Sequence, residues 1–489
     1  MGLANVGRLF WLRFSMTIDI NTLRAAFSGK LLTATEEMAP YLLDWRKRYQ
    51  GAALAVAEPD TTADVAAVVR WCAARGIAIV PQGGNTGLSG GSVPDMGGNS
   101  VVLSLRRLNK VRTIDLQNNT MTVEAGCILE TLQKTAKDAG RLFPLSLAAQ
   151  GSCTIGGNLS TNAGGVQVLR YGNARELCLG LEVVTAQGEV WGGLRGLRKD
   201  NTGYDLRDLF IGAEGTLGII TAAVLKLYPL PVAKQVAFVA VANPAQAVAL
   251  LGLAQTHLGA DLTAFELISA MALGLVLKHV PQAKHPIESS SQSPWYVLLE
   301  CSDTHGAARC QAQMERLFEA AFEANLISDG VLSANETQFR ALWALREDIS
   351  EAQAAEGKNI KHDISVPISR IAEFIELNSA KMAAQFSGHS AVRQVVFGHL
   401  GDGNLHYNVS PPLLENHDAF LRNQDAMNKL VHDDVAAFGG SISAEHGLGV
   451  LRRDEATRYK SAVEMGLQKA IKVALDPKNL MNPGKVLMI

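Results

Sequence analysis

The sequence carries little net charge, few cysteines and no long uninterrupted apolar run. Its formal net charge is −2 at pH 7, so nothing in bulk electrostatics favours nucleic acid or an anionic membrane. The six cysteines show no Cys-x-x-Cys spacing, and a chain of 489 residues needs no disulfide scaffold, so reduced thiols are expected. The most apolar stretch, residues 247–280, is interrupted by polar and charged side chains and lacks the roughly 20 successive apolar residues of a membrane helix. We therefore expect a cytoplasmic protein without a transmembrane segment.

The first 16 residues, MGLANVGRLFWLRFSM, do not form a secretory signal, which would need a longer apolar run and a small-residue cleavage site. We expect an N-terminal extension here, with Met16 as an alternative start. The length of the chain predicts two to four domains.

The pattern of elements changes at Pro229-Leu230-Pro231, which we take as a domain boundary. Before it, we expect a helix at residues 61–75, strands at 77–80, 101–105 and 219–228, a helix at 128–139, and hairpins at 111–125 and 179–191. After it, we expect strands at 236–241, 296–301 and 392–397, helices at 245–257, 306–325, 337–356 and 368–386, an exposed loop at 289–294, and a helical tail after residue 444. Strands that alternate with paired helices predict a sheet covered on one face.

Glycine stands out, because the 45 glycines are unevenly distributed and residues 83–98 and 151–172 are rich in them. The first stretch follows a predicted strand and reads PQGGNTGLSGGSVP over residues 81–94. Glycine permits positive φ and leaves backbone N–H groups open to an anion, while Asn85, Thr86 and Ser89 add side-chain donors. The loop is neither a Walker loop nor a Gly-x-Gly-x-x-Gly fingerprint entering a helix. It is either a diphosphate cradle or a long turn.

Two further loops favour the cradle. Residues 150–165 read QGSCTIGGNLSTNAGG, and DNTGYDL at residues 200–206 leads to IGAEGTLGIIT at residues 211–221. Three glycine- and hydroxyl-rich loops are more than turns alone require.

These loops resemble the FAD-binding domain of the vanillyl-alcohol-oxidase type flavoproteins, in the branch of the D-2-hydroxyglutarate and D-lactate dehydrogenases. The similarity runs from about residue 40 to the C-terminus. It implies that the first loop wraps the FAD diphosphate and that the other two contact the ribityl chain and isoalloxazine. The cofactor-binding residues that it implies are Pro81, Gly83, Gly84, Asn85, Thr86, Gly87, Gly90 and Gly91 in the first loop, Gly151, Gly156, Gly157, Asn158, Thr161, Asn162 and Gly165 in the second, and Glu214, Gly215, Ile219 and Ile220 in the third.

The flavin is expected to be non-covalent. Some relatives attach it through a histidine in the first loop or a cysteine in the second. The first loop here has no histidine, and Cys153 lies where the resembling branch also has a cysteine without a covalent bond. A small buried cysteine is the preferred interpretation.

The resemblance also implies the fold class, α+β, with a vanillyl-alcohol-oxidase-type FAD-binding domain, an α+β substrate or cap domain and a helical C-terminal segment. The expected limits are an N-terminal extension and helix at 1–39, the FAD-binding domain at 40–231, the cap domain at 232–435, and a C-terminal segment that packs near the flavin at 436–489.

A second pattern combines histidines with a carboxylate. FGHLGDGNLHYNV at residues 397–409 places His399 and His406 across a glycine turn, and AEHGLG at residues 444–449 adds Glu445 and His446. Two histidines and a carboxylate leave positions open for a substrate, as in catalytic divalent sites, although a single histidine is more often an ordinary hydrogen-bonded residue. The resemblance assigns His399, His406 and Glu445 to a metal, usually zinc, and His446 to the catalytic base.

Two segments supply cations: WALREDIS at residues 343–350 and KNIKHD at residues 358–363. Arg346 offers a planar fork suited to a carboxylate and Lys361 a point charge, although both residue types usually form surface pairs. The resemblance assigns Arg346, Ser350, Lys361 and Asn408 to the substrate carboxylates. Position 350 is often threonine in relatives, so the hydroxyl is kept and a methyl is lost.

The expected activity is FAD-dependent oxidation of a small dicarboxylic D-2-hydroxy acid, D-2-hydroxyglutarate or D-malate. The metal lowers the pKa of the hydroxyl, His446 accepts its proton and the C2 hydride passes to the flavin. The resemblance implies an electron acceptor such as an electron-transfer flavoprotein or a quinone, and a homodimer.

Three alternatives stay open at this point. A D-lactate or glycolate dehydrogenase would need only one carboxylate anchor. A zinc hydrolase could use His399, His406 and Glu445 with a metal-bound water, but then the glycine loops have no role. A non-catalytic flavin-binding module would bind FAD without reduction by any hydroxy acid.

Overall fold

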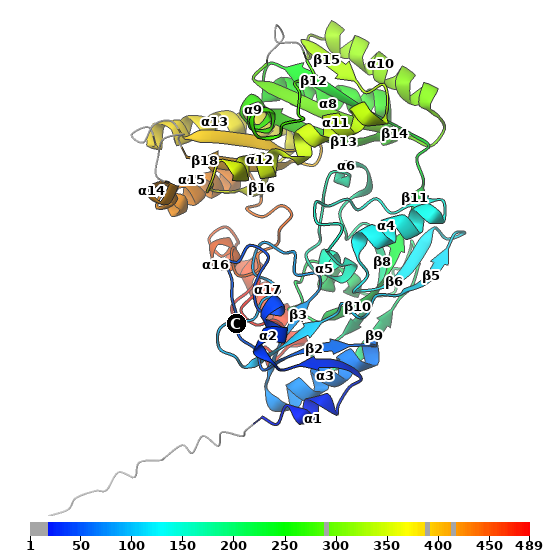
Figure 1. Ribbon diagram of the computed structural model, residues 1–489, viewed down its shortest axis with the longest axis vertical. Coiled ribbons are helices and arrows are strands. Elements are labelled where there is room, and N and C mark those ends of the chain that lie inside the picture. Colours follow the sequence, from blue (N-terminus) through cyan, green and yellow to red (C-terminus); the bar gives the residue numbers. More distant parts are fainter. Residues whose placement is uncertain (1–17, 288–292, 387–391, 412–416) are drawn as a thin grey trace, which may run out of the picture.

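The computed structural model describes residues 18–287, 293–386, 392–411 and 417–489. These form two parts, which lie one above the other in Figure 1. The lower part holds the chain before β12 together with its C-terminal end, and the upper part holds the largest sheet. The expected extension up to residue 17 and most of the expected loop at 289–294 lie outside the described residues.

A four-stranded sheet with the order β1-β2-β4-β3 lies at the base of the lower part. The expected helix at 61–75 is confirmed as α3, which begins where the side chain of Thr61 accepts a hydrogen bond from the N–H of Asp64 and ends at Gly76, with φ 64°. β3 ends at Gln82, so the first glycine loop starts directly at the end of a strand. The bounds are α1 Asn21–Arg24, β1 Gly29–Leu32, α2 Thr35–Met38, β2 Ala55–Pro59, α3 Thr62–Arg75, β3 Ala78–Gln82 and β4 Ser100–Ser104.

The second sheet of the lower part has the order β5-β6-β10-β8-β9 and is antiparallel throughout. Both expected hairpins are confirmed, as β5–β6 and β8–β9. The second glycine loop enters α5 and the third precedes β10, so both open at this sheet. The bounds are β5 Val111–Asp115, β6 Thr120–Glu124, α4 Leu129–Asp138, β7 Arg141–Leu142, α5 Ile155–Ser160, α6 Val168–Tyr171, β8 Cys178–Val184, β9 Val190–Gly193, α7 Leu206–Phe210, β10 Ile219–Lys226 and β11 Tyr228–Pro229.

The upper part is built on a seven-stranded antiparallel sheet with the order β15-β12-β14-β13-β17-β18-β16. The three strands expected here are present as β12, β14 and β17. The strand bounds are β12 Ala233–Val241, β13 Leu262–Ser269, β14 Trp295–Asp303, β15 Asp329–Leu332, β16 Asp363–Ser365, β17 Arg393–His399 and β18 Asn404–Ser410.

The expectation that helices cover this sheet on one face is wrong, because both faces are covered. One apolar core joins alternate strand residues such as Val239 and Leu299 to α8, α10, α13 and α15, and another joins their neighbours Phe238 and Leu298 to α9, α11 and α12. The expected helix at 337–356 is two helices, and residues 392–411 hold a hairpin. The helix bounds are α8 Pro244–Leu258, α9 Ala270–His279, α10 Ala307–Glu323, α11 Glu336–Glu347, α12 Ile349–Ala355, α13 Ile371–Gln385, α14 His417–Leu421 and α15 Gln424–Ala437.

Two central elements, β13 and α9, had no predicted counterpart. Both lie in the apolar stretch 247–280, which begins within α8, and β13 is buried at every position, which hides its period of two. The sequence analysis therefore missed α9 and did not place the expected helix at 337–356 on a second face of the sheet.

The C-terminal segment returns to the lower part. Met481 bridges to Ile79 of β3, and the ammonium of the buried Lys472 donates to the carbonyl of Thr216 at 2.7 Å. The expectation of a helical tail directly after residue 444 is only partly right, because residues 444–452 form a loop and the helices are α16 Arg453–Ala456 and α17 Ala462–Leu475.

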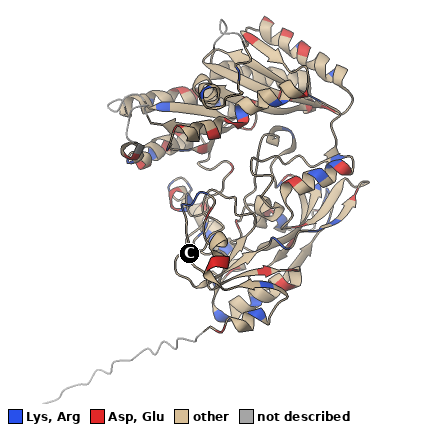
Figure 2. Cartoon of the chain, in the orientation of Figure 1, with Lys and Arg blue, Asp and Glu red and all other residues tan. Residues whose placement is uncertain are grey.

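The distribution of charged residues and the hydropathy of the helices agree with what the composition predicts. Basic and acidic residues are interspersed over both parts in Figure 2. Among the residues that the structure describes, no helix is both long and apolar enough to cross a membrane.

Candidate active site

The three glycine loops converge on one cavity. It is lined by members of all three loops, including Gly84 of the first, Asn158 of the second and Glu214 of the third, together with His446 from the C-terminal segment. A base candidate therefore opens into the same cavity as the loops.

Most of the expected cofactor residues line this cavity. They are Pro81, Gly83, Gly84, Asn85, Thr86, Gly87, Gly91, Gly156, Gly157, Asn158, Thr161, Glu214, Gly215, Ile219 and Ile220. Gly90, Gly151, Asn162 and Gly165 are not among the lining residues. Gly90 faces the ring of Tyr49, and Gly165 has its Cα close to the backbone of Ser146, so both serve loop packing. Residues not expected from the sequence also line the cavity, among them Gln82, Ser89, Thr154 and Ser160.

The loops approach each other more closely than side chains would allow. A Cβ atom on Gly83 would lie 2.3 Å from Oγ1 of Thr154, and one on Gly84 would lie 2.2 Å from the carbonyl oxygen of Ser152. Three buried oxygens of the lining residues, Oε1 of Gln82, Oγ1 of Thr154 and Oδ1 of Asn158, have no hydrogen-bond partner among the described residues. Buried polar atoms are normally paired, so this cavity fits a polar ligand such as a dinucleotide.

Cys153 also lines the cavity, and its side chain is buried. Burial raises the pKa of the thiol above its usual value, despite a hydrogen bond from Asn158. The protonated thiol is a poor nucleophile, which fits a flavin held without a covalent bond.

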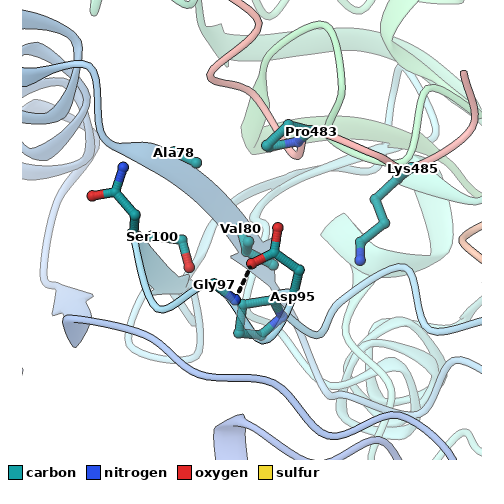
Figure 3. A pocket seen from close by; sticks show the side chains of 9 residues that line it. Ala78, Val80, Asp95, Gly97, Ser100, Pro483 and Lys485 are labelled. Carbon is teal, nitrogen blue, oxygen red and sulfur yellow. Dashed lines mark hydrogen bonds between the residues drawn. The ribbon is translucent and has the colours of Figure 1, made fainter. Parts of the chain in front are cut away.

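A second hollow is lined by Ala78 and Val80 of β3 together with Asp95 and Lys485 (Figure 3). Burial lowers the pKa of Lys485 to about 8. None of the second and third glycine loops lines this hollow, so we place the candidate cofactor site in the first cavity.

Glu214 ties the third loop to the C-terminal segment. Its carboxylate accepts hydrogen bonds from the N–H groups of Leu448 at 2.8 Å and Gly449 at 2.9 Å. Burial raises the pKa of Glu214 to about 7, which these two bonds only partly offset. The backbone that follows His446 is therefore fixed directly to the wall of the cavity.

The histidine pattern forms a cluster beside this cavity. One ligand atom each of His399, His406 and Glu445 lies within 4.8 Å of the others. His399 ends β17 and His406 lies on β18, so the hairpin of these two strands brings both imidazoles to one side. Nε2 of His399 lies 3.3 Å from Oε1 of Glu445. Two imidazoles and one carboxylate at this spacing are a suitable donor set for a divalent ion such as zinc.

Glu266 is a functional candidate that the sequence analysis missed. Its carboxylate lies 2.7 Å from Nδ1 of His399 and accepts a bond of 2.7 Å from Nε of Arg346. Burial disfavours its charge, but His399 and Arg346 outweigh burial and hold the pKa of Glu266 at about 2. With Nδ1 engaged by Glu266, Nε2 of His399 faces the cluster, which is the usual support of a metal-binding histidine. The available signal was a lone acidic residue inside an apolar run.

Asp363 supports His446 in the same manner. Its Oδ2 lies 3.0 Å from Nδ1 of His446 and accepts hydrogen bonds from the N–H groups of Glu445 and His446. Burial works against the charged imidazole, but Asp363 prevails and raises the pKa of His446. The side chain is 36% exposed, into the cavity. Nε2 of His446 is therefore available as a proton acceptor.

Lys361 lies on the same face as Asp363, because the two are separated by one residue in extended chain. The register that pairs Asp363 with His406 places Lys361 beside Asn408. Burial and the charges of Arg46 and Arg48 lower the pKa of Lys361 to about 8. Its ammonium group has no carboxylate partner among the described residues.

The other three expected substrate residues differ in their exposure and in the bonds that they already make. Arg346 is buried, bonded to Glu266 and stacked on the ring of Phe397 at 4.8 Å. Ser350 is exposed at the start of α12. Asn408 is buried and already donates to Oε1 of Gln353 at 2.9 Å while it accepts from the N–H of His362. Of the four expected substrate residues, Arg346 and Lys361 are the cations, whereas Asn408 has one amide hydrogen without a partner among the described residues.

Two family models match the chain. Residues 53–192 match the FAD binding domain, and residues 230–486 match the C-terminal domain of FAD linked oxidases. The chain is 39% identical to D-2-hydroxyglutarate dehydrogenase, mitochondrial, of Bos taurus over 470 residues, which are 96% of this chain and 83% of the relative. It is 40% identical to D-2-hydroxyglutarate dehydrogenase of Xanthomonas citri pv. viticola over 457 residues, 94% of each chain.

Solved structures show the same fold at lower sequence identity. The chain matches p-cresol methylhydroxylase with substrate bound at a TM-score of 0.73 and 18% identity, over 96% of each chain. It matches 4-ethylphenol oxidase from Gulosibacter chungangensis at a TM-score of 0.71 and 20% identity, again over 96% of each. The fold is therefore of the vanillyl-alcohol-oxidase type, and the chain belongs to the FAD-linked oxidases, in the family of the D-2-hydroxyglutarate dehydrogenases.

Proposed function

We propose that this protein oxidises D-2-hydroxyglutarate to 2-oxoglutarate with FAD as the hydride acceptor. The observation that carries the proposal is the position of His446, which lines the cavity of the glycine loops and adjoins the cluster of His399, His406 and Glu445. A substrate whose hydroxyl faces His446 has its C2 hydrogen beside the cavity where the flavin would be held.

The chain supplies the proton acceptor. Asp363 holds Nδ1 of His446, so the Nε2 lone pair is free to accept the hydroxyl proton, and the raised pKa makes the imidazole a stronger base. Pro81, the first-loop glycines and Asn158 would hold FAD, which supplies hydride-accepting chemistry when bound.

We further propose that His399, His406 and Glu445 hold a divalent metal ion, and that this ion is Zn²⁺, because two imidazoles and a carboxylate suit it. Such an ion would supply Lewis-acid chemistry at the hydroxyl end of the substrate. Glu266 orients His399 and balances the charge of Arg346, so the cluster keeps its geometry in a buried setting. Arg346, Ser350, Lys361 and the remaining amide hydrogen of Asn408 are proposed to orient the carboxylates.

The alternatives fit these observations less well. A zinc hydrolase leaves the glycine loops and the match to the FAD binding domain without a role. A D-lactate or glycolate dehydrogenase would leave Lys361 without a carboxylate partner. A flavin-binding module without catalysis gives no reason for the Asp363–His446 pair.

We also propose an electron-transfer flavoprotein or a quinone as acceptor, since each turnover leaves two electrons on the flavin. A homodimer is proposed on family resemblance. The cytoplasm is proposed because all six cysteines are unpaired and buried.

The test is product analysis with both enantiomers. The purified protein is incubated with D- or L-2-hydroxyglutarate and an artificial two-electron acceptor, and 2-oxoglutarate is measured. We expect product from the D-enantiomer and none from the L-enantiomer. Product from D-lactate at a higher kcat/KM than from D-2-hydroxyglutarate would favour the monocarboxylate alternative.

A further inference from the structure

The helix α17 in the lower part of the molecule turns its apolar side to solvent (Figure 1). Val463, Leu467 and Ile471 repeat every four residues along one side of this helix, and they are 73%, 62% and 37% exposed. The only buried residue of the helix is Lys472. The usual arrangement of a surface helix is therefore reversed. We call the exposed side the α17 stripe, which consists of Val463, Leu467, Ala470, Ile471 and Ala474.

The buried Lys472 fixes this orientation of the helix. It follows Val463 by about two and a half helical turns, so the two side chains point in opposite directions. Its ammonium group donates to the carbonyls of Thr216 at 2.7 Å and Met481 at 2.9 Å, and it pairs with Asp476 at 2.6 Å. A rotation that hides the stripe would break this buried ion pair and both hydrogen bonds, which is costly in free energy. The stripe is therefore a permanent part of the surface.

The stripe lies close to the cavity of the glycine loops. Thr216, which accepts the bond from Lys472, is buried in the third loop directly after Glu214 and Gly215, which line the cavity. α17 therefore lies behind the wall of the cavity, and the stripe is on its outer side, at the width of one helix, about 10 Å. A protein bound to the stripe would lie near the FAD that the cavity would hold.

The charges beside the stripe are basic. Lys469 and Lys478 are exposed, and neither forms an ion pair with a described residue. Glu464, the acidic residue of α17, is already paired with Lys460. The complementary surface is therefore apolar at its centre and acidic at its margin.

The size and composition of the stripe favour a transient protein contact. A helix of 14 residues is about 21 Å long and 10 Å wide, so the stripe offers roughly 200 Å². A stable complex buries about 800 Å² on each partner, whereas electron-transfer encounters are among the smallest specific contacts. The stripe also lacks the aromatic residues that helices on membrane surfaces commonly use.

We propose that the α17 stripe is the docking surface of a soluble protein electron carrier with an apolar contact surface and an acidic margin. The proposal rests on the proposed function, because oxidation of the substrate must first leave two electrons on the bound FAD. The carrier takes up these two electrons and is reduced, the FAD returns to its oxidised form, and the proton that came with the hydride is released to water.

The test compares a protein acceptor with a small one. The protein acceptor is purified electron-transfer flavoprotein, and the small acceptor is dichlorophenolindophenol, a dye that needs no docking surface. The variants are Leu467→Glu and Lys469→Glu, and the matched control is Leu377→Glu, at an exposed leucine of α13 in the upper part. Affinity for the carrier is measured on the oxidised protein without substrate, and bleaching of the flavin by D-2-hydroxyglutarate is followed separately.

We expect Leu467→Glu to weaken binding of the carrier and to lower kcat/KM for it by at least about tenfold, with dye reduction and bleaching changed by less than about twofold. Lys469→Glu should have a smaller effect that decreases as salt rises, because exposed charges are screened. Leu377→Glu should match the original protein. Unchanged carrier reduction in Leu467→Glu, equal losses with both acceptors, or no binding of the carrier by the original protein would overturn the proposal.

The other occupants of the stripe give different results. If Leu467→Glu turns a dimer into a monomer and leaves carrier reduction unchanged, the stripe joins two copies of this chain. If the variant abolishes sedimentation with vesicles of anionic phospholipid and leaves carrier reduction unchanged, the stripe binds a membrane. Either result would overturn the proposal.

Failure of the proposed function is distinguishable from failure of the docking surface. If D-2-hydroxyglutarate does not bleach the flavin while carrier binding still depends on Leu467, the proposed reaction is wrong and the docking surface stands. If bleaching occurs but carrier binding is the same in Leu467→Glu, only the docking surface is wrong.

Discussion

The flavin cavity and the histidine cluster lie side by side but are formed by different kinds of residue. The cavity is walled by glycines and small polar residues whose backbones almost touch, as Gly84 does with Ser152. The cluster of His399, His406 and Glu445 is supported by buried charged side chains, such as Glu266 at 0% and Arg346 at 7% exposure, which are paired with each other. The cavity therefore depends on the absence of Cβ atoms, and the cluster depends on charge balance. Substitutions in the cavity should act through steric clashes, whereas substitutions in the cluster should act through unpaired charges.

The largest expected difference between the two regions follows from removal of the metal. A chelator should lower turnover by at least about 100-fold while FAD stays bound, because the proposed ligands belong to the upper part and the C-terminal segment and not to the glycine loops. Turnover, metal content and flavin content are measured on one sample, and added Zn²⁺ should restore the rate. An unchanged rate after verified metal loss would contradict the catalytic role of the metal.

Charge balance in the cluster is tested by Glu266→Gln. This change removes the carboxylate shared by His399 and Arg346, and metal affinity should fall by about 10- to 100-fold. Arg346 is left buried without its ion pair, so the free energy of unfolding should fall by about 3 kcal/mol. The measurements are metal competition and denaturant unfolding. Glu347→Gln, at an exposed carboxylate next to Arg346, is the control and should change neither.

Missing Cβ atoms in the cavity are tested by two alanine variants. Gly84→Ala would place a Cβ 2.2 Å from the carbonyl oxygen of Ser152, so it should destabilise the FAD-free protein by about 1–3 kcal/mol and weaken FAD binding. Gly87 has no atom within 4 Å of its Cβ position, so Gly87→Ala should keep the stability of the FAD-free protein and weaken FAD binding alone. Equal stability of the two FAD-free variants would show that the loops do not pack as described.

The smallest expected effect is a pH dependence that belongs to the charged region only. The pKa of Lys361 is lowered to about 8 by burial and by Arg46 and Arg48, so the ammonium form predominates below that pH and is lost above it. Affinity for glutarate should therefore fall, by up to about tenfold, between about pH 7 and about pH 9. Flavin perturbation titrations measure it. Lys361→Arg should remove the decline, and a decline that persists in this variant would assign it to another group.

Local features of the cavity could be predicted from the sequence. The strand that ends at Gln82, the glycine loops and the hairpin that carries His399 and His406 follow from spacing and glycine placement within short segments. The supporting residues Glu266 and Asp363 could not be assigned, because their partners lie 133 and 83 residues away in sequence. The pairing of β13 with β17 brings Glu266 to His399, and the bridge between Ser365 and Ser441 brings Asp363 to the loop that carries His446.

The helices that cover the upper sheet show a different limit of prediction from the sequence. Periodicity identified α8, α10 and α13, but β13 is buried at every position and merges with α9 into one apolar run. A strand covered by helices on both sides shows no alternation, so a one-sided sheet was the simpler interpretation.

The central claim is that the base and the flavin cavity serve one reaction. The direct measurement is anaerobic addition of D-2-hydroxyglutarate to the FAD-loaded protein and to His446→Gln, with the flavin absorbance followed over time. We predict complete bleaching in the original protein and a rate lower by about 10²- to 10⁴-fold in the variant at equal FAD content. No bleaching in the original protein, or equal rates in the two, would contradict the account.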